Sequence, residues 1–329
     1  MQITVFSAYA HEQPYLTRAA QGQHELHFVV APLGLDTVAQ AQGSQAVAIF
    51  ANDDASAPVL ERLAAMGVRG VAVRAAGHDQ VDLAAAHRLG LRVANAPDYS
   101  PYAVAEHAVT LMLALNRRLR QADQQLRTYD FRLSNLVGFD MHGKTVGIIG
   151  CGRIGGVLAR ILHGFGCRPL AYDVKTNDEL RQRYDLSYVP LEQLCAESDI
   201  ISVHAPLNEH TRHLIDADLL AKMKPGAMLI NTGRGAVIDT EATLAALQSG
   251  HLGYLGIDVY EHEKGLYFND HTLSPRADQL FAALLAHPNA LITGHQAFLT
   301  REALSNIADA TMASVTRWEH NEPSTCELV

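Results

Sequence analysis

The chain of 329 residues has only four cysteines, and none of them has the spacing of a metal site. Cys151, Cys167, Cys195 and Cys326 form no C-x-x-C pair, and the 17 histidines are scattered along the sequence. We therefore expect no bound metal, and free thiols of the kind that persist in a reducing cytoplasm.

Long apolar runs and an excess of basic residues are also missing. No run approaches the roughly 20 apolar residues that a membrane-spanning helix needs, and residues 1–7 lack the basic segment that opens a signal peptide. The 26 Lys and Arg residues against 35 Asp and Glu residues give a formal net charge of −9. This balance argues against nucleic acid or a membrane as the main partner, although a local cationic group could still bind a small anionic substrate.

The chain is rich in short apolar runs that alternate with helical patterns. The hydrophobic fraction of 48% is sufficient for two cores, and the length predicts two domains. Alternation of this kind predicts parallel sheets covered by helices. The predicted strands are 3–6, 26–30, 46–50, 70–73 and 92–94 in the first half, and 145–149, 168–172, 200–203, 227–230, 254–257 and 290–292 in the second.

Prolines mark a hinge between the two halves, near Pro101, where a helical pattern begins that continues to about Leu126. A second helical pattern runs from Glu302 to Trp318. We expect an α/β protein with one domain at 1–100 plus 299–329 and another at 101–298. The polar tail from Asn321 is expected to pack loosely.

The second half opens with a pattern typical of dinucleotide binding. A strand pattern ends at Ile149, and Gly150, Gly152 and Gly155 follow as G-x-G-x-x-G before a helical pattern. Gly150 would allow a tight turn, and Gly152 would let a pyrophosphate approach the backbone. Gly155 would let the helix pack close to the strand, while the helix N-terminus offers free N–H groups to the phosphates.

An acidic residue at the end of the next predicted strand completes this pattern. Asp173 lies 18 residues after Gly155, close to the spacing of a carboxylate that binds the adenosine ribose. Such a carboxylate would repel a 2′-phosphate, so NAD is the expected cofactor. The alternative is a glycine-rich turn that binds nothing, which the combination of strand, helix and acid disfavours.

Polar and glycine residues also follow the other predicted strands of the second half. In doubly wound sheets, ligands bind at the carboxyl ends of the strands. We therefore expect these residues to gather at one edge, an arrangement that core packing does not explain. They are His204-Ala205-Pro206, Thr232-Gly233-Arg234, Asp258, Glu261-His262-Glu263 and His295.

Three of these side chains could serve a nicotinamide reaction, in which the cofactor moves a hydride and the protein handles one proton. His295 is the candidate proton donor, and Glu263 would hold its imidazole and favour the charged form. Arg234, which lies between two glycines, would bind a substrate carboxylate through two parallel hydrogen bonds.

Structural alternatives remain for each of these residues. His295 could be a histidine that only ends a strand, and Glu263 could belong to a solvated charged turn. Arg234 could be a surface arginine, although it would then lie near a helix N-terminus, where a cation is unfavourable. His204 either lines the cofactor pocket or satisfies backbone groups, and His107, within an apolar helical pattern, is more simply structural.

Over essentially its whole length the chain resembles the D-isomer-specific 2-hydroxyacid dehydrogenases. The similar motifs are VGIIGCGRIG, SVHAPL, MKPGAMLINTGRG, GIDVYEHE and TGHQAFLT. Within the family, FANDD, APDYSPYAVAEHAV and DVYEHEKGLYF resemble the bacterial fermentative D-lactate dehydrogenases most. The resemblance implies a flavodoxin-like substrate domain, a Rossmann NAD-binding domain and a substrate in the cleft between them. It further implies pyruvate reduction to D-lactate by a homodimer or homotetramer, with the helix after Pro101 in the dimer contact.

The resemblance also assigns roles to individual residues. It implies Arg234, Glu263 and His295 as the catalytic set. Backbone amides around Ala76 and Gly77 would bind the substrate carboxylate, and Tyr99 and Phe298 would wall a small pocket. The implied NAD contacts are Gly150, Gly152, Arg153, Ile154, Gly155, Asp173, His204, Ala205, Pro206, Thr211, Thr232, Gly233 and Asp258.

One departure affects the expected substrate. His78-Asp79 follows Gly77, where fermentative relatives more often have an aromatic residue and an asparagine. Another 2-hydroxyacid dehydrogenase, acting on hydroxypyruvate, phosphoglycerate or a bulkier 2-oxo acid, is therefore the first alternative. A non-enzymatic NAD-sensing corepressor of the same fold is the second, although such proteins usually carry extra tails.

Overall fold

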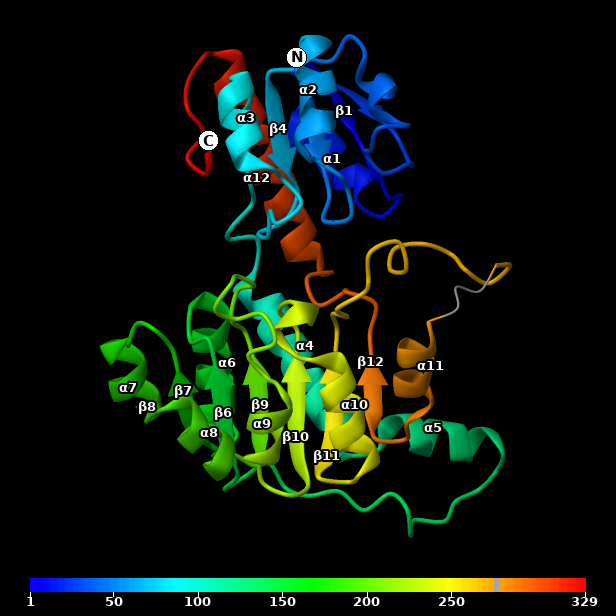
Figure 1. The fold of residues 1–329 in the computed structure, drawn as a ribbon, viewed down its shortest axis with the longest axis vertical. Helices are drawn as coiled ribbons and strands as arrows, with labels where there is room; N and C mark the ends of the chain where they lie inside the picture. Colours follow the sequence, from blue (N-terminus) through cyan, green and yellow to red (C-terminus); the bar gives the residue numbers. More distant parts are fainter. Residues whose placement is uncertain (275–277) are drawn as a thin grey trace. The chain divides into compact units, whose positions relative to one another are not determined.

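The structure is a computed structural model, and it describes residues 1–274 and 278–329. The chain divides into two compact units (Figure 1). The first unit contains Met1–Ser100 and Phe298–Val329, and the second contains Pro101–Ala297. The sequence predicts that the chain returns to the first domain at residue 299. In the structure it returns one residue earlier, at Phe298.

The first unit contains a five-stranded parallel sheet in the order β2-β1-β3-β4-β5. This is the flavodoxin-like order, and it confirms the fold class expected for this half. The strands are β1 (Gln2–Val5), β2 (Glu25–Phe28), β3 (Ala46–Ile49), β4 (Gly70–Val73) and β5 (Arg92–Ala94).

Helices cover both faces of this sheet because its central strands β1, β3 and β4 bury side chains on both sides. One core lies under α1 (Gln13–Ala20) and α12 (Arg301–Glu319). The other lies under η1 (Val38–Ala41), α2 (Ala57–Ala65) and α3 (Leu83–Leu89).

The C-terminal tail is held more firmly than the sequence suggested. The Leu328 N–H donates to the Val93 carbonyl at 2.7 Å, and the Val93 N–H donates to the Val329 carbonyl at 3.0 Å. The hydroxyls of Ser314 and Ser324 lie 2.8 Å apart. Alternating backbone bonds of this kind place the end of the chain alongside β5, so the expectation of loose packing was wrong.

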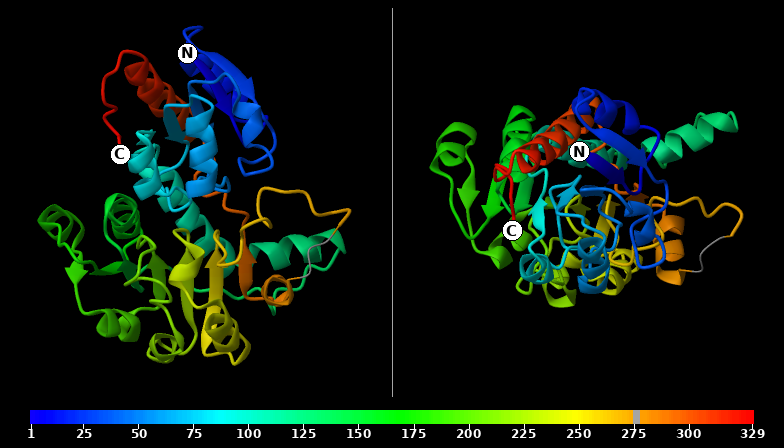
Figure 2. Two further views of the ribbon diagram at one scale, coloured as in Figure 1. Left: turned by 45° about the horizontal axis from the view of Figure 1, so that its top comes forward. Right: turned by 90° about the horizontal axis from the view of Figure 1, so that it is seen from above.

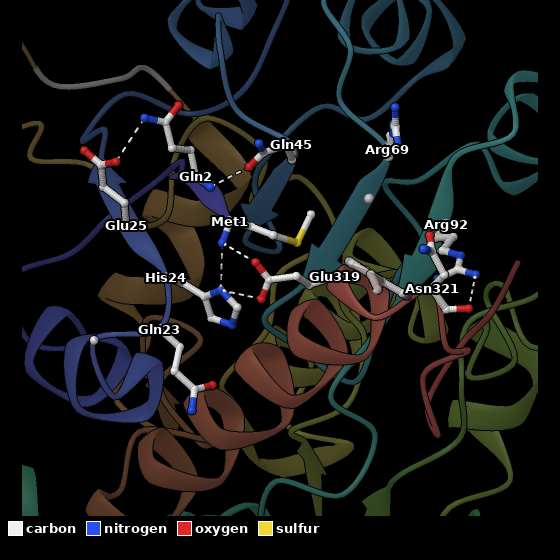
Figure 3. Close-up of a pocket in the computed structure, with 13 residues that line it drawn as sticks. Met1, Gln2, Gln23, His24, Glu25, Gln45, Arg69, Arg92, Glu319 and Asn321 are labelled. Carbon is white, nitrogen blue, oxygen red and sulfur yellow. Dashed lines mark hydrogen bonds and ion pairs between the residues drawn. The ribbon is translucent and has the colours of Figure 1, made fainter.

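A pocket of about 700 Å³ lies at the amino ends of these strands (Figure 3). At its floor the N-terminal ammonium lies 2.9 Å from Glu319 Oε1 and 3.2 Å from His24 Nδ1. Ligands of doubly wound sheets bind at the carboxyl ends of the strands. The pocket is therefore at the opposite end of the sheet from the predicted substrate residues.

The second unit contains a seven-stranded parallel sheet in the order β12-β11-β10-β9-β6-β7-β8. Counted from β6, this is the Rossmann order 3-2-1-4-5-6 with one further strand at the edge. The sequence predicted six strands and missed β8, whose two residues are too few for a recognisable pattern. The strands are β6 (Thr145–Ile149), β7 (Arg168–Tyr172), β8 (Ser187–Tyr188), β9 (Ile200–Val203), β10 (Ala227–Asn231), β11 (Leu252–Ile257) and β12 (Ala290–Ile292).

Helices also cover both faces of the second sheet (Figure 2). One face packs against α4 (Pro101–Asn116) and α6 (Arg153–Gly164), and the other against α8 (Leu191–Glu197), α9 (Ala217–Ala221), α10 (Thr240–Gln248) and α11 (Gln279–Ala286). A further helix, α7 (Asp178–Tyr184), packs against α6. Among the described residues, no helix combines the length and the apolar character needed to cross a membrane.

The single long helix predicted from Pro101 to Leu126 is two helices. Arg118, between α4 and α5 (Leu119–Arg127), has a φ of +53°. This left-handed conformation cannot continue an α-helix. Helix α4 is largely buried within the second unit, whereas α5 has no buried residue.

Candidate active site

The glycine loop between β6 and α6 has the geometry that the sequence predicted. Gly150 has a φ of +88°, and a Cβ there would lie 2.6 Å from the Ala205 nitrogen. A Cβ at Gly155 would lie 2.2 Å from the Gly150 carbonyl oxygen, so the helix can approach the strand only with glycine at this position. At Gly152, the N-cap of α6, an added Cβ would meet no atom within 4 Å from other parts of the described chain, which leaves the backbone open to a ligand.

Asp173 directly follows β7 and touches this loop. Its Oδ2 accepts a hydrogen bond from the Cys151 N–H at 2.6 Å, and its Oδ1 accepts one from the Lys175 N–H at 2.9 Å. The two strand ends meet because β6 and β7 are neighbours, with Ile149 opposite Tyr172. The carboxylate is therefore fixed beside the loop predicted to bind pyrophosphate.

The Cys151 thiol in the loop is buried, and burial raises its pKa to about 11. It is therefore protonated at neutral pH and has no character of a nucleophile.

The segment after β9 forms a compact turn beside the glycine loop. His204 N–H donates to the Ile149 carbonyl at 2.7 Å, and the Thr211 hydroxyl donates to the Pro206 carbonyl at 2.5 Å. The His204 imidazole lies 2.8 Å from the Ser202 hydroxyl through Nε2. Burial lowers the pKa of His204 to about 4, so the ring is neutral at physiological pH.

The loop after β10 is shaped by a buried asparagine. Asn231 accepts a hydrogen bond from the Gly233 N–H at 3.0 Å and donates one to the Arg234 carbonyl at 2.9 Å. A Cβ at Gly235 would lie 2.2 Å from the Tyr260 carbonyl carbon, so only glycine fits there. The guanidinium of Arg234 donates to the Gly233 carbonyl at 3.0 Å.

The candidate proton donor and its carboxylate partner are in contact. His295 Nδ1 lies 2.9 Å from Glu263 Oε1, and Glu263 Oε2 accepts the Tyr260 N–H at 3.0 Å. Because a carboxylate only accepts, Nδ1 carries the hydrogen and Nε2 is left for a substrate. The Phe268 ring lies 5.6 Å from the imidazole, and the two side chains of the pair are 18% and 26% exposed.

Strand register brings these segments to one edge of the sheet. Asn231 at the end of β10 pairs with Ile257 at the end of β11, which pairs with Ile292 at the end of β12. Arg234, Asp258 and His295 therefore start from the same level, and adjacent strands are only about 4.8 Å apart. This edge carries the catalytic set that the resemblance implies.

Asp258 accepts hydrogen bonds from the segment that carries His295. Its carboxylate accepts the Thr293 hydroxyl at 2.5 Å and the backbone N–H groups of Gln296 and Ala297 at 2.9 and 2.8 Å. The residue has no exposed surface, and its expected contact with NAD stays a prediction. The side chain holds the turn around His295.

Residues predicted to bind the substrate from the first unit also follow strand ends. Ala76 and Gly77 come after β4, and the segment is fixed by Asn95 Nδ2, which donates to the Ala76 carbonyl at 2.7 Å. The Ala96 N–H donates to the Ala75 carbonyl at 3.0 Å.

Tyr99 and Phe298 belong to an aromatic cluster within the first unit. Their rings lie 6.4 Å apart, and the Phe298 ring lies 5.7 Å from Phe50. Phe50 in turn contacts Tyr9, with ring centroids 5.8 Å apart. The role of Tyr99 and Phe298 as pocket walls, which the resemblance implies, stays a prediction. Phe50 and Tyr9 were not singled out, because aromatic residues after short strands give no signal of their own.

A fully buried arginine in the first unit was also missed. Arg74 donates to the Phe6 and Ala48 carbonyls, each at 2.8 Å, and its guanidinium lies 3.0 Å from Glu12. It therefore ties the ends of β1 and β3 to the segment that begins at Ala75. A charged residue directly after an apolar strand was the available signal.

Comparison with known proteins identifies the family. A model of the NAD-binding domain of D-isomer-specific 2-hydroxyacid dehydrogenases matches residues 109–297. The chain is 44% identical over 330 residues to the D-lactate dehydrogenase of Escherichia coli (strain K12), with 100% of both chains covered. The chain belongs to the D-isomer-specific 2-hydroxyacid dehydrogenase family. It is thus an oxidoreductase with an NAD-binding domain, which disfavours the corepressor alternative.

Solved structures of the family have the same fold. The pyruvate reductase of Chlamydomonas reinhardtii superposes with a TM-score of 0.93 at 42% identity, and the match covers 99% of this chain and 98% of that one. The D-lactate dehydrogenase of Aquifex aeolicus, complexed with NAD and lactic acid, superposes with a TM-score of 0.87 at 28% identity. That match covers 97% and 96% of the two chains.

The second unit fits a dinucleotide. The position of Gly152 is open, and Asp173 is fixed beside it. Two buried polar atoms at neighbouring strand ends, His204 Nδ1 and Thr232 Oγ1, have no partner within the described chain. Buried polar atoms are normally hydrogen-bonded, so a polar ligand at this edge would complete them. No group of side chains arranged for a metal ion occurs among residues 1–274 and 278–329.

Proposed function

We propose that this protein is an NAD-dependent D-lactate dehydrogenase, which reduces pyruvate to D-lactate and catalyses the reverse reaction. The observation that carries the proposal is the His295–Glu263 pair at 2.9 Å, on the same sheet edge as Arg234. The D-lactate dehydrogenases of Escherichia coli and Aquifex aeolicus, which align over nearly the whole chain, support it.

The chain's own residues have three tasks in this reaction, in which the bound nicotinamide supplies or accepts the hydride. Arg234 binds the substrate carboxylate with two parallel N–H groups and orients the carbonyl. His295 Nε2 gives its proton to the C2 oxygen during reduction and takes it back during oxidation. Glu263 stabilises the imidazolium through Nδ1 and fixes the direction of the ring.

Substrate comparison tests the proposed substrate. NADH consumption is measured with pyruvate, hydroxypyruvate and longer 2-oxo acids, and the product is resolved by chirality. We expect the highest kcat/KM with pyruvate and D-lactate as the product. A higher kcat/KM with another 2-oxo acid would move the assignment to a different member of the family.

Replacement of His295 by Asn tests the proton transfer. We expect kcat for pyruvate reduction to fall by about 10²–10⁴-fold, the usual contribution of a general acid, while NADH binding measured by fluorescence is retained. Near-normal turnover would remove His295 from this role.

We also infer that the protein forms a homo-oligomer through the region of α5 and the loop that follows it. Large apolar side chains are exposed there, including Tyr129 at 84% and Val137 at 75%, and clustered apolar surface of this kind marks interaction sites. The other exposed members are Leu119, Leu126, Phe131 and Leu133. Light scattering after gel filtration would give a dimer or tetramer mass, and Phe131→Asp should lower it; a monomeric mass for the unchanged protein would contradict the inference.

A cytoplasmic location is part of the proposal. All four cysteines are free, and three of them are buried, as expected for a protein of a reducing compartment. Fractionation with detection of the intact chain would test it.

A further inference from the structure

We propose that His107 and Thr293 form a positioning chain that acts through Asp258 to hold the backbone turn carrying His295. The inference rests on the proposed function, because it gives both side chains a task in that reaction. Neither residue belongs to the predicted catalytic or cofactor-binding set.

Asp258 is the centre of this chain. The Thr293 hydroxyl donates to Asp258 Oδ1 at 2.5 Å, and the same oxygen accepts the Gln296 N–H at 2.9 Å. The Ala297 N–H donates to Oδ2 at 2.8 Å. Burial alone would raise the pKa of this carboxyl, but the hydrogen bonds from His107, Thr293 and the backbone outweigh it and lower the pKa. Asp258 is therefore an ionised carboxylate that is closed to solvent.

His107 reaches this carboxylate from helix α4. Its Nε2 lies 3.0 Å from Thr293 Oγ1 and 3.5 Å from Asp258 Oδ1. Because the Thr293 hydrogen is used on Asp258, the Thr293 oxygen accepts, and His107 Nε2 must carry a hydrogen. The chain thus runs from His107 to Thr293 to Asp258, with every donor directed towards the carboxylate.

The turn that these contacts hold is conformationally unfavourable. His295 has a φ of +53°, a left-handed conformation that is unfavourable for a residue with a side chain. The His295 N–H donates to the Asp258 carbonyl at 2.7 Å, so three consecutive N–H groups point at this one residue. Successive N–H groups of this kind form a concavity that needs a negative charge. If Asp258 moves, His295 can relax and its imidazole leaves Glu263.

Simple core packing does not account for the arrangement. A buried carboxylate, a threonine hydroxyl and a histidine cost more to desolvate than apolar side chains of the same size. The hydrogen bonds among these groups and with the turn satisfy them. The geometry therefore assigns to His107 and Thr293 the task of keeping His295 in position. The proton of the proposed reaction must pass through His295.

Thr293→Val tests the chain because it removes the hydroxyl and keeps the shape. We expect kcat with pyruvate to fall about 10–100-fold, the effect of a small displacement of a reacting group. The solvent deuterium isotope effect on kcat should rise, since proton transfer becomes slower, while the KM for pyruvate changes little. Thr293→Ser should restore kcat, and His107→Leu should repeat the effect of Thr293→Val.

The first unit offers a matched control. His24 Nε2 lies 2.8 Å from the Thr316 hydroxyl, the same kind of pair at a distance from the proposed chemistry. Thr316→Val should therefore leave kcat and the isotope effect unchanged. The double variant His107→Leu with Thr293→Val should lose hardly more kcat than the single variant with the lower kcat. Both replacements act through the one Asp258 carboxylate, so their effects should not add.

Amide hydrogen exchange of Gln296 and Ala297 provides a readout that does not need turnover. Loss of a hydrogen bond to a charged group is worth about 1.5 kcal/mol, so exchange in Thr293→Val should be about tenfold faster. An unchanged exchange rate of these two amides in Thr293→Val would overturn the inference. Faster exchange with an unchanged kcat would also overturn it, and so would a raised KM for pyruvate with an unchanged kcat. If the unmodified protein reduces no 2-oxo acid, the proposed function fails, and the exchange data still decide whether these residues hold the turn.

Discussion

The partly buried, neutral His204 should make the second unit sensitive to acid. Its folded-state pKa is lowered to about 4 by burial, whereas an unfolded histidine titrates near 6.5. The unfolded chain therefore binds a proton first as the pH falls. The contribution of neutral His204 to the free energy of unfolding is fully present above about pH 6.5. It is lost progressively between about pH 6.5 and pH 4.

The structure gives the size of this loss. The difference between the two pKa values, at about 1.4 kcal/mol for each pH unit, amounts to about 3–4 kcal/mol in the free energy of unfolding when the titration is complete. Solvent screens the imidazole only weakly, because its Nδ1 is buried and has no partner within the described chain. The Nε2 contact with Ser202 at 2.8 Å fixes the ring in this position.

His204→Gln removes the titration while retaining an amide that can reach Ser202. Urea denaturation at pH 7.5 and pH 4.5, read by pulsed hydrogen exchange and mass spectrometry, would follow the two units separately. Between pH 7.5 and pH 4.5, the second unit should lose about 3 kcal/mol less of its free energy of unfolding in the variant than in the unchanged protein. The first unit serves as an internal reference. Equal losses of unfolding free energy in both proteins would refute the conclusion that His204 is neutral in the folded protein.

Three further replacements test the site. Gly235→Ala should destabilise the second unit by about 1–3 kcal/mol, because its Cβ would meet the Tyr260 backbone at 2.2 Å; thermal unfolding measures this, and Gly233→Ala, with no atom nearer than 3.5 Å, should cost less. Asp173→Ala should weaken NAD binding about 10–100-fold through loss of hydrogen bonds to a charged group, and titration with NAD and NADP should show a narrower preference; an unchanged preference would exclude the ribose role. Arg234→Lys should raise the KM for pyruvate sharply, since a point charge cannot form the paired hydrogen bonds; steady-state kinetics check this, and an unchanged KM would contradict carboxylate binding by Arg234.

The sequence allowed the fold to be predicted because parallel strands and glycine loops leave strong local patterns. Runs such as 145–149 are fully buried, so they read as continuous apolar stretches. Gly150 and Gly155 are required by contacts of 2.6 Å and 2.2 Å with the backbone, and this requirement is what makes the motif recognisable. The two-residue strand β8 and the break at Arg118 left no comparable pattern.

The supporting residues of the candidate site could not be predicted in the same way. His107 lies in an apolar helix and Thr293 directly after a strand, and their common partner Asp258 is more than thirty residues from either one. Only the pairing of β11 with β12 and the packing of α4 on the sheet bring them together. A local pattern carries no information on such contacts, so a structural role was the natural expectation for His107.

The two side chains proposed to contact the substrate from the second unit are held in the same way. Arg234 and His295 each lie on a loop beyond a strand end, and a buried polar side chain holds the backbone of that loop: Asn231 for the first and Asp258 for the second. These anchors belong to neighbouring strands, because the Asp258 N–H donates to the Asn231 carbonyl at 2.9 Å. The relative position of the guanidinium and the imidazole therefore depends on the sheet register more than on the loops. A change that shifts β11 against β10 should reduce turnover even where neither reacting side chain is altered.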